Sequence, residues 1–153
     1  MMKPYFPKQD GQPNPLWVIV KRKVRFEEVD PLGIVWHGRY SGYFEDARVE
    51  LGQQFGIGYM EFYKHGIVAP IKKLHADYHR PLKFQEKMTI EALLHWSDAA
   101  RMNFEFIIRN SQKELTTTGY TIQMMMDLQE NILVTPPAFY VDICKKWKAG
   151  ELN

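Results

Sequence analysis

The chain has 153 residues, 45% of them hydrophobic, which is enough to bury the core of one globular domain. Its 20 basic and 18 acidic residues leave a formal net charge of only +2, and the interspersed signs argue against a dedicated nucleic-acid binder. No apolar run approaches the roughly 20 residues that span a bilayer. Cys144 is the single cysteine, so no disulfide can form within the chain and a reducing compartment fits it. We therefore expect a soluble, cytoplasmic protein without membrane insertion.

Residues 1–15 contain four prolines among polar residues and no apolar run of signal-peptide length, so we expect no secretion. We interpret this segment as an N-terminal arm, followed by a single domain over residues 16–153. From Leu16 to Glu28 apolar and polar side chains alternate, with Val18, Val24 and Phe26 on the apolar face. This alternation predicts a strand.

Between Tyr40 and Gly56 the apolar residues recur at spacings of three and four. This spacing predicts a helix of about four turns that ends near Gly56. Gly42 and Gly52 lie inside the helix, where each costs about 1 kcal/mol relative to alanine. We interpret both as positions where a sheet packs closely against the helix.

After Gly66 the apolar period changes to two. Four further strands are predicted, at residues 74–79, 88–96, 102–108 and 120–128. The last three are expected to form an antiparallel meander, and Tyr120, Ile122 and Met124 make the apolar side of the final one. Thr135 and Pro136 resemble the N-cap and first residue of a short terminal helix. One long helix followed by a run of strands indicates an α+β fold, with an antiparallel sheet covering a single helix.

The segment from Val29 to Tyr40 has the layout of an active-site loop. It places Asp30 ahead of a turn that contains Gly33, and His37 lies just before the predicted helix. A carboxylate that faces a helix N-terminus combines a base or nucleophile with an anion-stabilising group of free N–H donors. The alternative is structural, because aspartate before proline and glycine is a common turn residue.

The residues of this loop carry a family resemblance. Asp30-Pro31-Leu32-Gly33-Ile34-Val35-Trp36-His37, with Tyr40, Phe44, Glu45 and Arg48 after it, resembles hotdog-fold acyl-CoA thioesterases of the 4-hydroxybenzoyl-CoA thioesterase type. His37 is similar to a broader branch that includes the Tol-Pal-associated thioesterases. Tyr78-His79-Arg80-Pro81-Leu82 resembles the third segment of the family, so the likeness spans most of residues 17–128.

The resemblance implies a hotdog fold, in which an antiparallel sheet wraps around one long central helix. It also implies hydrolysis of an acyl or aryl thioester of coenzyme A or acyl carrier protein to a free acid and a thiol, with no cofactor. Asp30 would be the nucleophile or the general base, and the sequence leaves both mechanisms open. Backbone N–H groups near His37 and Gly38 would stabilise the oxyanion, while the His37 imidazole has an open second role in orienting substrate or water. Gly33 would adopt a positive φ that aims Asp30.

Substrate-binding candidates are less specific than the loop. The candidates for an acyl or aryl pocket are Trp36, Tyr40 and Tyr43, and those for the coenzyme A phosphates are Arg80, Lys83 and Arg101. Core packing is the alternative for the aromatic residues, and solvated surface charge is the alternative for the cations. Family members often place a basic cluster after the strand that ends here at Trp96, whereas this chain has residues 97–101 with a single cation there.

Other chemically notable residues receive structural interpretations. Glu45 and Arg48, three residues apart on the predicted helix, are expected to form a salt bridge. His75 and His79 lie about 13 Å apart along one strand face, too far to share a metal ion, so we expect no metal site. Cys144 is expected to pack in the core.

A single hotdog domain has an exposed sheet edge and an incomplete pocket. The resemblance therefore implies a homodimer or homotetramer, with each active site at a subunit interface. A non-catalytic module that binds an acyl thioester is the rival interpretation, since the same scaffold can hold a ligand without cleaving it. A hotdog dehydratase would need its own histidine and acidic pair in another loop, which the sequence lacks.

Overall fold

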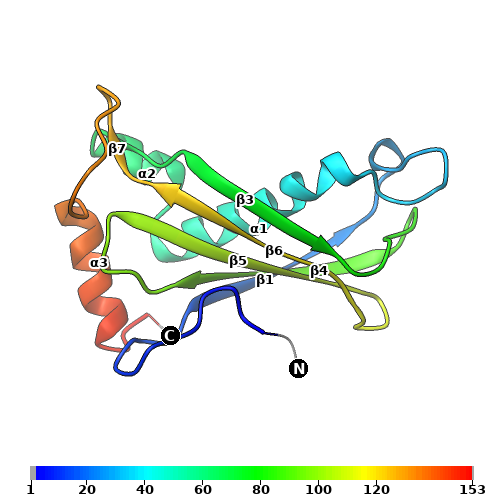
Figure 1. Ribbon diagram of the computed structural model, residues 1–153, viewed down its shortest axis with the longest axis horizontal. Helices are drawn as coiled ribbons and strands as arrows, with labels where there is room; N and C mark the ends of the chain where they lie inside the picture. The colour runs from blue at the N-terminus through cyan, green and yellow to red at the C-terminus, as the bar shows by residue number, and fades with distance from the viewer. Residues whose placement is uncertain (1–2, 153) are drawn as a thin grey trace.

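The computed structural model describes residues 3–152 (Figure 1), so the first two residues of the predicted arm lie outside the described range. Its main layer is a five-stranded antiparallel sheet in the order β1-β4-β5-β6-β3. The strands are β1 (Leu16–Lys23), β3 (Ile71–Tyr78), β4 (Lys87–His95), β5 (Arg101–Asn110) and β6 (Leu115–Met124). The predicted meander of the last three long strands is confirmed. Two short strands, β2 (Ile67–Val68) and β7 (Met126–Asp127), form a separate pair.

Three α-helices accompany the sheet in the described part of the chain. They are α1 (Tyr40–Phe55), α2 (Tyr59–Lys64) and α3 (Ala138–Lys148), and single 3₁₀ turns lie at Phe26–Glu28 and His37–Arg39. The long helix α1 ends as predicted, at Gly56, which has a φ of 70° and donates its N–H to the Gly52 carbonyl. None of these helices combines the length and apolar character that a membrane span requires.

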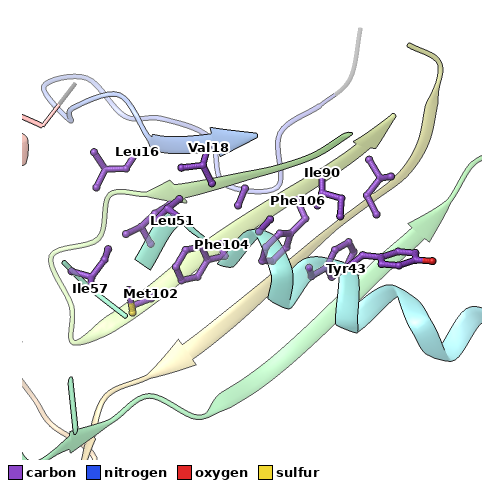
Figure 2. Packing of buried hydrophobic residues seen from close by; sticks show 14 of the residues in the cluster. Leu16, Val18, Tyr43, Leu51, Ile57, Ile90, Met102, Phe104 and Phe106 are labelled. Atoms are coloured by element: carbon purple, nitrogen blue, oxygen red, sulfur yellow. The ribbon is translucent and has the colours of Figure 1, made fainter. Parts of the chain in front are cut away.

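The core fills the space between α1 and one face of the sheet (Figures 1 and 2). Tyr43, Phe44 and Leu51 of the helix are buried, and the Phe44 ring stacks on Phe106 of β5 with ring centroids 4.6 Å apart. Figure 2 shows Phe104 and Phe106 next to each other along the central strand, close to α1. This packing confirms the predicted α+β arrangement of one sheet covering one long helix.

The first predicted strand ends five residues early. β1 stops at Lys23, and Phe26, predicted to face the core, has 78% of its surface exposed. Glu28 causes the change, because its buried carboxylate accepts the Arg25 N–H at 2.8 Å and pairs with Arg22 at 2.7 Å. These bonds close a 3₁₀ turn in place of the last strand residues.

The prediction for the core face of β6 was wrong. Thr121 and Gln123 are the buried residues, whereas Tyr120 and Ile122 lie on the opposite, outer face of the sheet. The helix determines this register: a Cβ at Gly119 would lie 2.7 Å from the Phe44 ring, and Gln123 binds a side chain of α1. Residues 120–128 are also two strands, since β6 ends at Met124 and β7 begins at Met126.

Two predictions about glycines and one about a helix start also need correction. Gly42 is exposed and has no neighbour within 4 Å of a Cβ position, so no sheet packs against it. Gly52 does lie close to another segment, but that segment is the loop after the helix and not the sheet: a Cβ on Gly52 would lie 2.8 Å from Gly58 Cα. The terminal helix begins at Ala138 with Pro137 at its N-cap, so Thr135 does not cap it.

Candidate active site

The loop from Val29 to Trp36 is anchored on both sides by backbone hydrogen bonds. Within the loop, the Asp30 N–H donates to the Ile34 carbonyl and the Gly33 N–H donates to the Asp30 carbonyl, both at 2.9 Å. Across the loop, Val35 N–H donates to the carbonyl of Leu82 at 2.8 Å. Gly33 has a φ of 76°, as predicted, and this is a conformation that side chains rarely adopt. The loop is therefore a fixed turn held against residues 82–84.

Asp30 lies half-buried at the top of this turn. Its Oδ1 accepts the Leu32 N–H at 2.9 Å, which is the turn-forming contact expected of an aspartate before proline. Its Oδ2 bonds to no residue in the range 3–152. One carboxylate oxygen therefore fixes the side chain and the other is left for a ligand.

The long helix starts directly after this loop. The 3₁₀ turn at His37–Arg39 leads directly into α1 at Tyr40. The N–H groups of His37 and Gly38 are the first two of this helical run, so the helix itself provides no acceptor for them. Both residues are exposed. The Trp36 ring covers Gly38 so closely that a Cβ there would lie 2.2 Å from the ring, which only glycine permits.

A groove of about 410 Å³ joins the loop, the helix start and the end of β3. It is lined by Asp30, Ile34, Val35, His37, Tyr40, Tyr78, His79, Arg80 and Pro81. The Tyr40 and Tyr78 rings meet edge to face with centroids 4.9 Å apart, and the Tyr78 hydroxyl donates to the His37 carbonyl at 3.5 Å. Four predicted site residues (Asp30, His37, Tyr40 and Arg80) thus share one groove. Tyr78 and His79 were not predicted as site residues. The sequence signal that could have identified them is an aromatic residue at the end of a predicted strand, just before His79-Arg80-Pro81.

Other predicted pocket residues lie elsewhere. The Trp36 side chain is 49% exposed and does not line the groove. Tyr43 is fully buried against the Arg22 guanidinium, and burial together with nearby Glu28 raises the pKa of its hydroxyl. The core-packing alternative therefore holds for Tyr43.

Arg101 is not brought to the groove. Its guanidinium donates to Asn103 at 2.9 Å. Tyr78 pairs with Thr117, and Thr117 pairs with Ile108, which lies about 23 Å along β5 from Arg101 at 3.3 Å per residue. Among the three predicted cations, Arg80 lines the groove with Asp30, whereas Lys83 forms a β-bridge with Ile34 and does not line it.

The predicted salt bridge between Glu45 and Arg48 does not form. Arg48 is 1% exposed and donates to the Gln123 side chain at 3.0 Å, with its guanidinium 4.5 Å from the centre of the Phe104 ring. Glu45 instead accepts the Tyr59 hydroxyl at 2.7 Å. Burial lowers the pKa of Arg48, opposed by Tyr59 and Glu45, and burial with the Glu45 contact raises the pKa of Tyr59 to about 12. This cluster is a closed polar network in the core.

His75 faces the outer side of the sheet, and His79 directly follows the end of β3 and lines the groove. His75 lies 3.0 Å from the Asp77 carboxylate, and His79 lies 3.0 Å from the Thr118 hydroxyl. No cluster of three or more potential metal ligands occurs in residues 3–152. Cys144 is partly buried against the core, and burial raises the pKa of its thiol to about 11.

Comparison with known families agrees with this architecture. Residues 24–144 match the model of the Thioesterase-like superfamily. The chain belongs to this family, and it is a thioester hydrolase with a hotdog fold.

Two curated relatives illustrate the range of the family. A Bacillus subtilis protein with the provisional name acyl-CoA thioesterase YneP is 25% identical over 105 residues, which cover 69% of this chain and 76% of that protein. The chloroplastic acyl-acyl carrier protein thioesterase ATL3 of Arabidopsis thaliana is 30% identical over 106 residues, covering 67% of this chain and 56% of that protein.

Solved structures have the same fold. The DHNA-CoA thioesterase from Staphylococcus aureus superimposes with a TM-score of 0.78 at 25% identity, covering 87% of this chain and 91% of that chain. The gentisyl-coenzyme A thioesterase BH1999 gives a TM-score of 0.70 at 18% identity, with 82% and 99% covered. The second likeness concerns the fold alone.

Proposed function

We propose that this protein is a cytoplasmic acyl-CoA thioesterase that hydrolyses an acyl or aryl thioester to a free acid and a thiol, with Asp30 as nucleophile or general base. The observation that supports this role is the shared groove of Asp30 and the start of α1. Asp30 Oδ2 has no protein partner within residues 3–152, and His37, whose N–H has no helical acceptor, lines the same groove, with Gly38 next to it in the chain. These are the two components that attack on a thioester carbonyl requires.

The chemistry needs little else. As a general base, Asp30 accepts a proton from water while the water oxygen attacks the carbonyl carbon; as a nucleophile, its carboxylate attacks that carbon and water then hydrolyses the anhydride. In either route the oxyanion lies toward the N–H groups of His37 and Gly38, where the helix dipole adds to their effect. The thiolate leaves and takes up a proton, and a thiolate leaving group needs no strong general acid.

The end of β3 lines the groove, and β3 also offers a free edge at which a second copy can pair. β3 is the last strand of the sheet, and its residues Leu74 and Tyr78 remain 46% and 55% exposed. A homodimer formed by pairing two β3 edges would cover both residues and remove the free edge. We propose this dimer as the minimal active unit, with a tetramer as a further level of assembly.

Light scattering tests the assembly. We expect a dimer or tetramer at micromolar concentration, and Leu74→Lys on the β3 edge should shift it toward monomer. Ile19→Lys on β1 is the matched control, because Ile19 is similarly exposed at 50% but lies on the strand at the opposite edge of the sheet. A wild-type monomer, or equal dissociation by both variants, would contradict a β3 interface.

Thiol release tests the activity itself. Purified protein is assayed with short-chain, long-chain and aromatic acyl-CoAs and with an acyl carrier protein thioester. We expect release from at least one class, and the ranking identifies the acyl group and the carrier.

A non-catalytic acyl-thioester-binding module is the second candidate. The contact between Asp30 Oδ1 and Leu32 N–H favours it, because a turn residue needs no chemistry. Binding of an acyl-CoA without thiol release from any substrate would select this alternative.

A further inference from the structure

The N-terminal arm lies against the outer face of the sheet, on the side away from α1. Tyr5 contacts His75 of β3 and Tyr120 of β6, with ring centroids 5.6 and 5.0 Å away. Neighbouring residues of these strands, such as Gly119, face the helix, and side chains alternate between the faces of a sheet. The arm is thus packed behind the strand whose end lines the active-site groove.

Hydrogen bonds join the Tyr5 hydroxyl to two strands at once. It donates to Asp77 Oδ2 of β3 at 2.5 Å and lies 2.8 Å from Thr118 Oγ1 of β6. His79 Nε2 lies 3.0 Å from the same Thr118 oxygen. All three hydrogen bonds form together when His79 donates to Thr118, Thr118 donates to Tyr5 and Tyr5 donates to Asp77. Hydrogen bonds linked in this way strengthen one another.

The charge states of this chain of bonds favour its persistence. Burial and the contact with Asp77 raise the pKa of Tyr5 to about 12, so its hydroxyl stays a donor near neutral pH. The contacts with Tyr5 and His75 lower the pKa of the Asp77 carboxyl, so it stays an acceptor. The other ionisable groups around Tyr5 are Glu105 of β5 and Lys73 of β3, the latter over the Tyr120 ring.

The residues held by Tyr5 continue directly into the groove. Tyr78 follows Asp77 and points to the helix side, where it contacts Tyr40 and the His37 carbonyl. His79, at the other end of the bonded chain, also lines the groove. Within residues 3–152, β3 pairs with β6 alone, and Tyr5 adds a side-chain attachment of this strand end on the outer face of the sheet.

We propose that Tyr5 is a positioning residue for the thioesterase site: through Asp77 and Thr118 it fixes the end of β3, so that Tyr78 and His79 present one defined wall to the substrate beside Asp30. This inference rests on the proposed function of the groove. Because Tyr5 touches none of the reacting atoms, its loss affects how well substrate is held and leaves the chemical step in place. The arm is therefore part of the binding site although it lies on the opposite face of the sheet.

Tyr5→Phe tests the proposal, since it removes only the hydroxyl and keeps the ring. We expect the KM for the best thioester to rise about five-fold, because substrate binding must then order a strand end that is held by one hydrogen bond fewer, with kcat within about two-fold of wild type. Asp77→Ala, which removes the acceptor, should give a similar rise, and the double variant should add nothing further, because both changes break the same hydrogen bond. Amide hydrogen exchange in residues 77–80 should be faster in all three variants.

Phe6→Leu is the matched control. Phe6 lies next to Tyr5 on the arm and packs against His95 and Tyr120, with no hydrogen bond to β3, so its KM and exchange rates should match wild type. The proposal is overturned if Tyr5→Phe behaves like this control, if its exchange rises without a change in KM, or if light scattering shows that it acts by dissociating the oligomer. A wild-type protein that hydrolyses no thioester would overturn the proposed function instead, and the exchange rates would then decide by themselves whether Tyr5 fixes β3.

Discussion

The helix α1 carries one polar cluster at its middle and another at its N-terminal end, and they are built in opposite ways. At the middle of the helix, the Arg48 guanidinium and Gln123 are buried and bonded to each other, and Tyr59 is bonded to Glu45. At the N-terminal end, Asp30 and His37 line an open groove, and Asp30 Oδ2 has no protein partner within residues 3–152. A satisfied network specifies packing, whereas unpaired donors and acceptors at a surface are available for a ligand. Both clusters are polar, so polarity alone does not distinguish a ligand site from a core contact, whereas free hydrogen-bonding capacity does.

Removing the buried cluster should have the largest effect on stability. Arg48→Ala leaves Gln123 and the Ile57 carbonyl without their donor and opens a cavity beside Phe104. We expect the free energy of unfolding to fall by about 3 kcal/mol or more, measured by urea denaturation. Arg39→Ala is the control, since Arg39 is exposed, and its change should stay within about 0.5 kcal/mol. Equal losses of unfolding free energy in the two variants would contradict a stabilising role of the Arg48 network.

The second largest effect on stability is expected where Gly119 of β6 packs closely against Phe44 of α1. In Gly119→Ala the new Cβ would lie 2.5 Å from the His75 carbonyl oxygen and 2.7 Å from the Phe44 ring. Overpacking of this kind costs about 1–3 kcal/mol, and thermal denaturation should report a lower Tm. Gly42→Ala should do the reverse, raising stability by up to about 1 kcal/mol, because its Cβ position on the helix is open. A neutral Gly119→Ala would refute the close approach.

The smallest effect is expected at the open end, from the His37 side chain. If its backbone N–H stabilises the oxyanion, His37→Ala keeps that donor and kcat should fall by less than about ten-fold. An imidazole that shares a proton with Asp30 predicts a loss of roughly 10²-fold and a pH–rate profile that differs from wild type. Steady-state kinetics across pH separates the two, and a large loss at unchanged Tm would assign the role to the side chain.

The sequence was sufficient where the signal is local. The apolar period of three and four, with a glycine able to take a positive φ after it, predicted α1 and its end at Gly56. The loop sequence, with Asp30 ahead of Gly33 and with His37 just before the helix, predicted the turn that contains Asp30, and Gly33 has the expected positive φ. Residue spacing determines such features within one or two elements.

Sequence reasoning failed where a distant partner decides the outcome. The core face of β6 is polar and small because Gly119 leaves room for Phe44 and because Gln123 binds Arg48, so the apolar pattern of that strand predicts the wrong face. Arg48 itself suggested a neighbour on its own helix, whereas its hydrogen-bond partner Gln123 lies 75 residues further along the chain. Tyr78 enters the groove only because β3 ends beside the helix start.

The central claim, that the open cluster at Asp30 performs the chemistry, is tested most directly by single-turnover thiol release with Asp30→Asn. Asparagine keeps the side-chain oxygen that accepts the Leu32 N–H and lacks the negative charge, so the turn should persist and the Tm should stay unchanged. With enzyme in excess over the best thioester, we expect substrate to bind and its hydrolysis to slow by on the order of 10²-fold or more. A variant that releases thiol at close to the wild-type rate would contradict the account, because Asp30 would then serve the turn alone.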